Sequence, residues 1–143
     1  MFDGAASGCS TTGVGGACNY DWTQGNFYAL AHGISPSRIL ALPQIYYPEN
    51  AAQWKFISLS GASGADRIDF VGPLTEFAAC SVPGSGCASG FLTADAAWQA
   101  LRSALSSNAA INLQRLPVAT DLRIDSAPGA PASAMRVTTA GVG

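Results

Sequence analysis

The stretch that decides the fold is Arg38–Leu59, RILALPQIYYPENAAQWKFISL. Residues 39–47 form a nearly unbroken apolar and aromatic run, which is typical of a parallel strand buried on both faces. Pro48 then interrupts the strand, and Asn50 is a candidate N-cap for a helix. Apolar residues recur at helical spacing after it. The stretch therefore predicts a strand, a short loop and a helix.

The flanking sequence extends this βα unit into an α/β fold. In chain order we expect the end of a strand and a loop at 1–8, a helix at 19–33, a strand at 67–75 bent at Gly72-Pro73, a helix from Thr93 and a strand at 116–124. Strands that alternate with helices in this way predict right-handed βαβ units and a parallel sheet. Residues 126–143 are rich in Pro, Gly and small residues without periodicity, so we expect the domain to span 1–125 and a disordered or linker tail to follow.

The chain is too short for a whole (β/α)8 barrel, which takes about 250 residues. Its 143 residues hold three to four βα units. Together with the abrupt start of the chain, this indicates a partial (β/α) barrel whose N-terminal half lies upstream. A small open α/β sheet is the alternative.

Composition excludes several classes of function. Apolar residues make up 48% of the chain and charged residues 11%, which suffices for the core of one domain. The formal charge is -2 and no basic cluster occurs, so nucleic acid is not an expected partner. No apolar run approaches the roughly 20 residues that a bilayer requires, so we expect no membrane span.

The four cysteines fall in two close pairs, Cys9 with Cys18 and Cys80 with Cys87, and each pair encloses a loop rich in small residues. These loops have no other means of ordering themselves, which favours local disulfides within each pair over the other possible pairings. A metal site is the competing interpretation, but the usual spacing of zinc ligands is absent. Disulfides would place the chain in an oxidising, extracytoplasmic compartment.

A resemblance rests on four segments that occur in order. They are DGAASGCS (3–10), CNYDWTQGN (18–26), LPQIYYPENAAQW (42–54) and DFVGPLTE (69–76). Over residues 2–124 the chain resembles the C-terminal part of glycoside-hydrolase-like, TIM-barrel domains of secreted, mostly actinobacterial and largely uncharacterised proteins. Such relatives often have Glu where this chain has Gln44. The resemblance implies that further catalytic acids lie on earlier strands, outside this sequence.

Glycoside hydrolysis commonly needs two carboxyl groups that flank the scissile bond. In a barrel they stand at the carboxyl ends of strands, and Asp3, Glu76 and Asp121 lie at or near such ends. Each also has a structural interpretation: Asp3 as a solvated loop acid, Glu76 as a loop cap, and Asp121 as a buried paired acid within an apolar strand.

Gln44 and Tyr46 are expected to bind sugar hydroxyls, because an amide does not ionise and a phenol titrates far above neutral pH. Filling of the barrel interior is the structural alternative for both. Trp22 is the candidate for stacking on a sugar ring, whereas Trp54 and Trp98 stand at helical spacing and are expected in the core.

These patterns predict an extracellular, glycoside-hydrolase-like domain that acts on or binds cell-wall or other polysaccharide. We expect the isolated chain to be an inactive fragment that needs no cofactor or metal and that associates with itself. The alternative is a non-catalytic module that binds carbohydrate or mediates surface interactions.

Overall fold

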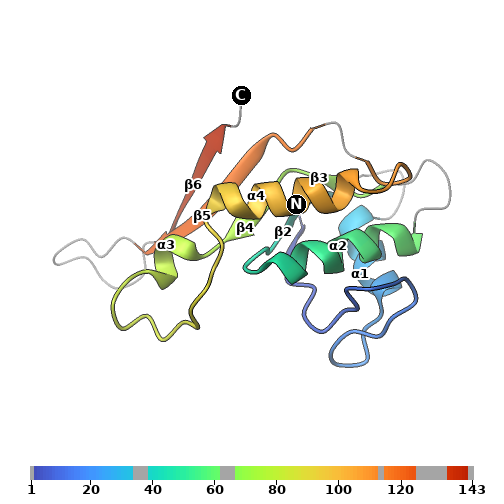
Figure 1. Cartoon of the computed structure of the whole chain (residues 1–143), viewed down its shortest axis with the longest axis horizontal. Coiled ribbons are helices and arrows are strands. Elements are labelled where there is room, and N and C mark those ends of the chain that lie inside the picture. The colour runs from blue at the N-terminus through green and yellow to red at the C-terminus, as the bar shows by residue number, and fades with distance from the viewer. Residues whose placement is uncertain (1, 34–38, 62–66, 113–114, 125–134, 142–143) are drawn as a thin grey trace.

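The computed structural model describes residues 2–33, 39–61, 67–112, 115–124 and 135–141, with the backbone alone in 123–124 and 135–141. Helices and strands alternate along most of this length (Figure 1), so the predicted α/β class is confirmed. In chain order the elements are β1 (Phe2–Gly4), α1 (Gln24–His32), β2 (Leu40–Pro43), α2 (Pro48–Gly61), β3 (Asp69–Phe70), β4 (Leu74–Thr75), α3 (Phe77–Cys80), α4 (Ala94–Ser106), β5 (Val118–Ile124) and β6 (Met135–Gly141).

The strands form two small sheets that adjoin, and their pairing is parallel except between β5 and β6. β2 pairs in parallel with β1 and with β3, β4 pairs in parallel with β5, and β6 is antiparallel to β5. A parallel bridge between Gln44 and Leu74 joins the two sheets, and the Val118 N–H donates to the Val71 carbonyl at 3.2 Å. The parallel strands therefore lie side by side in the same order as they occur in the sequence. No closed barrel forms within the described residues, and their small sheets agree with the expected alternative, a small open α/β sheet.

Gly72 and Pro73 divide the expected strand at 67–75 into β3 and β4, as the sequence predicts. Gly72 has φ 154°, and a Cβ at this position would meet the carbonyl oxygen of Val118 on β5. Only glycine allows the backbone to approach β5 so closely. The bend thus connects β3, which belongs to one sheet, with β4, which belongs to the other.

One apolar core lies between the strands and the helices α1, α2 and α4. The three helices pack against one another in chain order, α1 on α2 and α2 on α4. Trp54 of α2 is fully buried, and its ring meets the rings of Phe2, Phe27 and Phe70 edge to face. Trp98 of α4 is 6% exposed and donates from its indole N–H to the Leu116 carbonyl. The prediction that these two tryptophans belong to the core is confirmed.

Two expectations for the stretch that decides the fold are wrong. β2 alternates instead of being buried on both faces: Ala41 is buried in the core, whereas Leu40 is 49% exposed. The helices cover the face of β2 that carries Ala41, and the side chain of Leu40 points to the opposite face. Asn50 lies inside the first turn of α2, which begins at Pro48. Its side chain accepts from the N–H groups of Tyr46 and Tyr47 and so fixes the loop before the helix.

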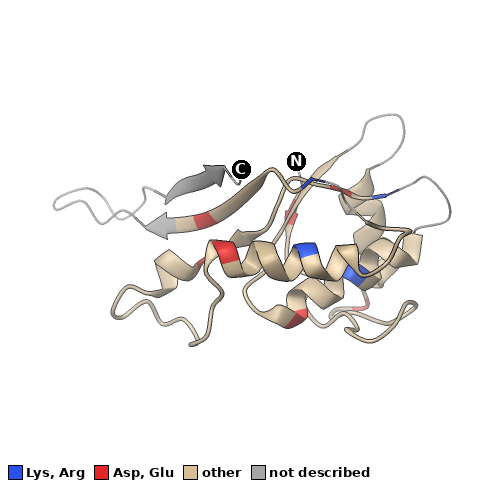
Figure 2. Ribbon diagram, turned by 45° about the horizontal axis from the view of Figure 1, so that its top comes forward, with Lys and Arg blue, Asp and Glu red and all other residues tan. Residues whose placement is uncertain are grey.

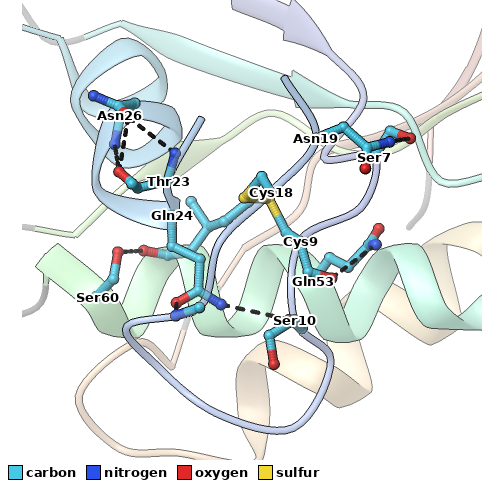
Figure 3. The surroundings of a disulfide bond; sticks show 12 residues. Ser7, Cys9, Ser10, Cys18, Asn19, Thr23, Gln24, Asn26, Gln53 and Ser60 are labelled. Atoms are coloured by element: carbon cyan, nitrogen blue, oxygen red, sulfur yellow. Dashed lines mark hydrogen bonds between the residues drawn. A yellow bond between two sulfur atoms is a disulfide. The ribbon is translucent and has the colours of Figure 1, made fainter. Parts of the chain in front are cut away.

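Both predicted disulfides, Cys9–Cys18 and Cys80–Cys87, are formed. The competing metal site is therefore overturned. Figure 3 shows the first disulfide beside α2, where the Gln53 side chain donates to the Cys9 carbonyl at 3.1 Å. Cys9 is 4% exposed and belongs to the core. Cys87, in contrast, lies in an exposed loop.

The end of the chain differs from the expected tail. β6 pairs with β5 from Met135 to Gly141, so these residues are not the linker that their composition suggests. The run Val137-Thr138-Thr139 has the β-branched residues that favour strands, and the signal was hidden by the Pro- and Gly-rich residues before it. The rest of the predicted tail lies outside the described residues.

Candidate functional site

Two of the predicted site residues meet at the carboxyl ends of β1 and β2. Asp3 lies on β1 in register with Leu42, and Gln44 follows β2 directly. The Gln44 side chain donates from Nε2 to Oδ1 of Asp3 at 3.2 Å. The parallel pairing brings both residues to one edge of the sheet, as the sequence analysis requires.

A second pair forms at the carboxyl end of β4. Glu76 follows β4 directly and is half-buried. The Tyr46 hydroxyl donates to Oε1 of Glu76 at 2.8 Å, a short hydrogen bond to a charged acceptor. Glu76 occupies the N-cap position of α3, but its side chain makes no cap hydrogen bond there. It is therefore directed to Tyr46, not to the helix that it precedes.

Both carboxylates act on Tyr46. Burial raises the pKa of Tyr46 far above its ordinary value, and the hydrogen bond to Glu76 and the negative charges of Glu76 and Asp3 raise it further. The phenol therefore remains a neutral hydrogen-bond donor. We refer to Asp3, Gln44, Tyr46 and Glu76 as the acid–amide–phenol cluster.

The position of Tyr46 is fixed by neighbours that sequence reasoning did not assign to the site. Its N–H donates to the Asn50 side chain at 3.1 Å, and its carbonyl accepts from the Leu92 N–H at 2.8 Å. Its ring lies 5.1 Å from that of Phe91, between centroids. Asn50 carried a capping signal in the sequence. No pattern marks Phe91, because a loop brings it to Tyr46 from a distance of 45 residues.

Asp121, the third predicted catalytic acid, lies on β5 and is already engaged. Its two carboxylate oxygens lie 3.1 and 3.2 Å from the backbone nitrogen of Ala78, which donates to them. Ala78 lies in the first turn of α3, whose N–H groups lack partners within the helix. This contact agrees with the structural alternative, in which Asp121 is a paired acid. It does not bring Asp121 into the acid–amide–phenol cluster.

Trp22, the predicted stacking residue, lines a different part of the surface. A cavity of about 330 Å³ lies between β1, the loop that follows the first disulfide and α1. It is lined by Phe2, Asp3, Gly4, Ala5, Ser7, Asn19, Tyr20, Trp22, Phe27 and Leu30. Asp3 alone belongs to both the cavity and the cluster. The two sites therefore share this residue.

Charged side chains are few and scattered over the ribbon (Figure 2), in keeping with the 11% charged residues of the chain. Within the described ranges, no three His, Cys, Asp or Glu side chains gather as metal ligands would. The helices described there include none that is long and apolar enough to cross a membrane.

The cluster suits a ligand that carries many hydroxyl groups. The two carboxylates accept hydrogen bonds, whereas the Gln44 amide both donates and accepts. A carboxylate can also transfer a proton, which Gln44 cannot do and the neutral Tyr46 does poorly near pH 7. Comparison with protein-family models, with curated proteins and with solved structures finds no match to this chain. Any function must therefore be inferred from the site itself.

Proposed function

We propose that this chain is part of an extracellular, glycoside-hydrolase-like domain that binds polysaccharide at the acid–amide–phenol cluster. One observation carries the proposal: Asp3 on β1 accepts a hydrogen bond from Gln44 after β2, and Glu76 after β4 accepts one from Tyr46, so two carboxylates on different strands are held by neutral donors. Glycosidases place paired acids at strand ends in this way. The disulfides Cys9–Cys18 and Cys80–Cys87 support the extracellular compartment.

The order of the strands supports a partial (β/α) barrel. Consecutive parallel strands with helices on one face are the arrangement of a barrel, whereas a doubly wound sheet reverses its strand order. Leu40 is exposed on the face opposite to the helices, which would be the interior of a barrel. We propose that an upstream segment completes the sheet, and that two copies of the isolated chain associate through the open face in its absence.

We propose further that the isolated chain does not cleave its ligand. Both carboxylates are held by neutral donors, Asp3 by Gln44 and Glu76 by Tyr46. Gln44 stands where the resembling proteins often have Glu, and Asp121 is bound to α3. These features also favour the second candidate function, a non-catalytic carbohydrate-binding module. A further catalytic acid decides between the two, since glycoside hydrolysis commonly needs two carboxyl groups that are free to act.

Binding to a panel of immobilised polysaccharides, with release of reducing ends measured in parallel, tests the proposal. We expect binding without hydrolysis, and at least about tenfold weaker binding for Glu76→Gln and for Asp3→Asn, a loss of about 1.4 kcal/mol. The matched controls are Glu49→Gln and Asp95→Asn, which remove exposed acids from the first turns of α2 and α4.

Two results would contradict parts of this proposal. Equal binding by all the variants, or no binding to any polysaccharide, would refute a binding role for the cluster. Hydrolysis by the isolated chain that Glu76→Gln abolishes would show that the fragment is a complete enzyme.

A further inference from the structure

The cavity beside the first disulfide loop has a wall of exposed aromatic rings. Trp22 is 40% exposed and Tyr20 is 91% exposed, although both are large apolar side chains. The ring of Trp22 lies 5.2 Å from that of Phe27, which in turn packs on the buried Trp54. Trp22 is therefore held in place by the core while part of its surface faces solvent.

The loop that presents these rings is strained and fixed at several points. Tyr20 and Asp21 both have positive φ, 57° and 59°, which non-glycine residues rarely adopt. The turn is closed by the Trp22 N–H, which donates to the Asn19 carbonyl at 3.3 Å, and by the Cys18 N–H, which donates to the Trp22 carbonyl at 2.8 Å. Strain of this kind persists only where the surroundings impose it, and it occurs often at ligand clamps.

Polar groups stand at the rim of the cavity. The Asn19 side chain donates to the Ser7 hydroxyl at 3.2 Å, as Figure 3 shows, and Asp3 also lines the cavity. The outward edge of β1 adds backbone groups: the Gly4 carbonyl accepts from Gln44 on the side of β2, so the peptide groups of Asp3 point the other way. Asp3 is the one charged residue among those that line the cavity, and it is negative.

We infer that this cavity is a second subsite that binds a neutral sugar unit of the same polysaccharide. Aromatic faces carry partial negative charge and attract the C–H groups of a pyranose ring, while the amide, hydroxyl and carboxylate groups bind its hydroxyls. The volume of about 330 Å³ lies at the lower end of the usual range for ligand pockets, which suits a small unit. Asp3 lines the cavity and also belongs to the cluster, so we expect one chain of sugars to contact both. The negative charge of Asp3 disfavours a uronic acid.

This inference rests on the proposed function, and tryptophan fluorescence can test it. Trp54 and Trp98 are buried, at 0% and 6% exposure, so a ligand that changes the emission acts through Trp22. Cellohexaose, xylohexaose and chitohexaose serve as neutral probes, and hexagalacturonate serves as the anionic one. We expect a neutral probe to shift or quench the emission and hexagalacturonate to have a weaker effect.

Calorimetry on variants then locates the site. Trp22→Ala should weaken binding about tenfold, and Tyr20→Ala several-fold, because aromatic anchors dominate binding energies. Trp22→Phe keeps the contact with Phe27 and should remove the fluorescence response without unfolding the chain. The control is Val82→Ala, a comparably exposed apolar side chain (43%) in the exposed loop between Cys80 and Cys87, which should bind as the parent does.

The outcomes separate this inference from the proposed function. If Glu76→Gln weakens binding and Trp22→Ala does not, the cluster binds sugar and the second subsite is refuted. If Trp22→Ala weakens binding and Glu76→Gln does not, the subsite stands and the proposed role of the cluster fails. If no neutral probe changes the emission of Trp22, or if hexagalacturonate binds more tightly, the inference is overturned.

Discussion

The two disulfides should stabilise the chain to different extents, although they close loops of similar length. Their sequence separations are 9 residues for Cys9–Cys18 and 7 for Cys80–Cys87. The loss of loop entropy in the unfolded chain then contributes about 2.6 and about 2.4 kcal/mol, respectively. Chain entropy alone therefore predicts nearly equal effects.

The two disulfides differ in their surroundings, and this should make their contributions to the unfolding free energy unequal. Cys9 lies in the core, and replacing its sulfur by hydrogen leaves a small void that costs about 1 kcal/mol more. Cys87 is exposed, so its removal leaves no void. We expect the double variant Cys9→Ala/Cys18→Ala to lose about 3.5 kcal/mol of unfolding free energy and Cys80→Ala/Cys87→Ala about 2.4 kcal/mol or less.

Urea unfolding of the oxidised parent and of both double variants, followed by tryptophan fluorescence, measures these values. The slope of the unfolding free energy against urea concentration must be the same for all three proteins, since a changed slope would show a changed unfolded state. A larger loss for Cys80→Ala/Cys87→Ala than for Cys9→Ala/Cys18→Ala would refute the reasoning. It would mean that the exposed loop, and not the buried one, holds the fold together.

Three further predictions concern single residues. The pKa of Tyr46 is raised in the folded state, so the unfolded chain loses this proton first and the free energy of unfolding should fall above about pH 10. Tyr46→Phe should remove this part of the fall when urea unfolding is measured from about pH 8 to 11. An identical fall in Tyr46→Phe would contradict the raised pKa of Tyr46. Gly72→Ala should destabilise by more than about 2 kcal/mol in thermal unfolding because its Cβ would meet the backbone of β5, whereas Gly13→Ala, which has open space around it, should cost less. Asp121→Ala removes the hydrogen bond to Ala78, so it should lower the free energy of unfolding by about 1 kcal/mol and leave polysaccharide binding unchanged. Loss of binding at unchanged stability would show that Asp121 is part of the binding site.

Local signals in the sequence predicted much of the fold. Thr93 caps α4, and Gly33, where the expected helix at 19–33 stops, ends α1 with φ 82°. The bend at Gly72 and the pairing of the cysteines also followed from nearby residues. Each of these features depends on groups only a few positions apart in the chain, which is where sequence patterns are informative.

Features that depend on distant contacts were missed. The exposure of Leu40 depends on which face of the sheet the helices cover, and no local pattern reveals this. The same limit applies to the candidate site: strand ends predicted Asp3, Gln44 and Glu76, but the bond of Asp121 to α3 joins residues 43 positions apart. The helix α3 was also missed, because its four residues are too few to show a helical periodicity in the sequence.

Nuclear magnetic resonance mapping of bound oligosaccharide tests the central claim most directly. Labelled chain is titrated with whichever of cellohexaose, xylohexaose or chitohexaose binds, and backbone and side-chain amide shifts are followed. The account predicts the largest changes at Asp3, Tyr46, Glu76 and the side-chain amide of Gln44, with saturation at one common affinity. Changes confined to the exposed loop at 81–90, or none at all at saturating oligosaccharide, would contradict it.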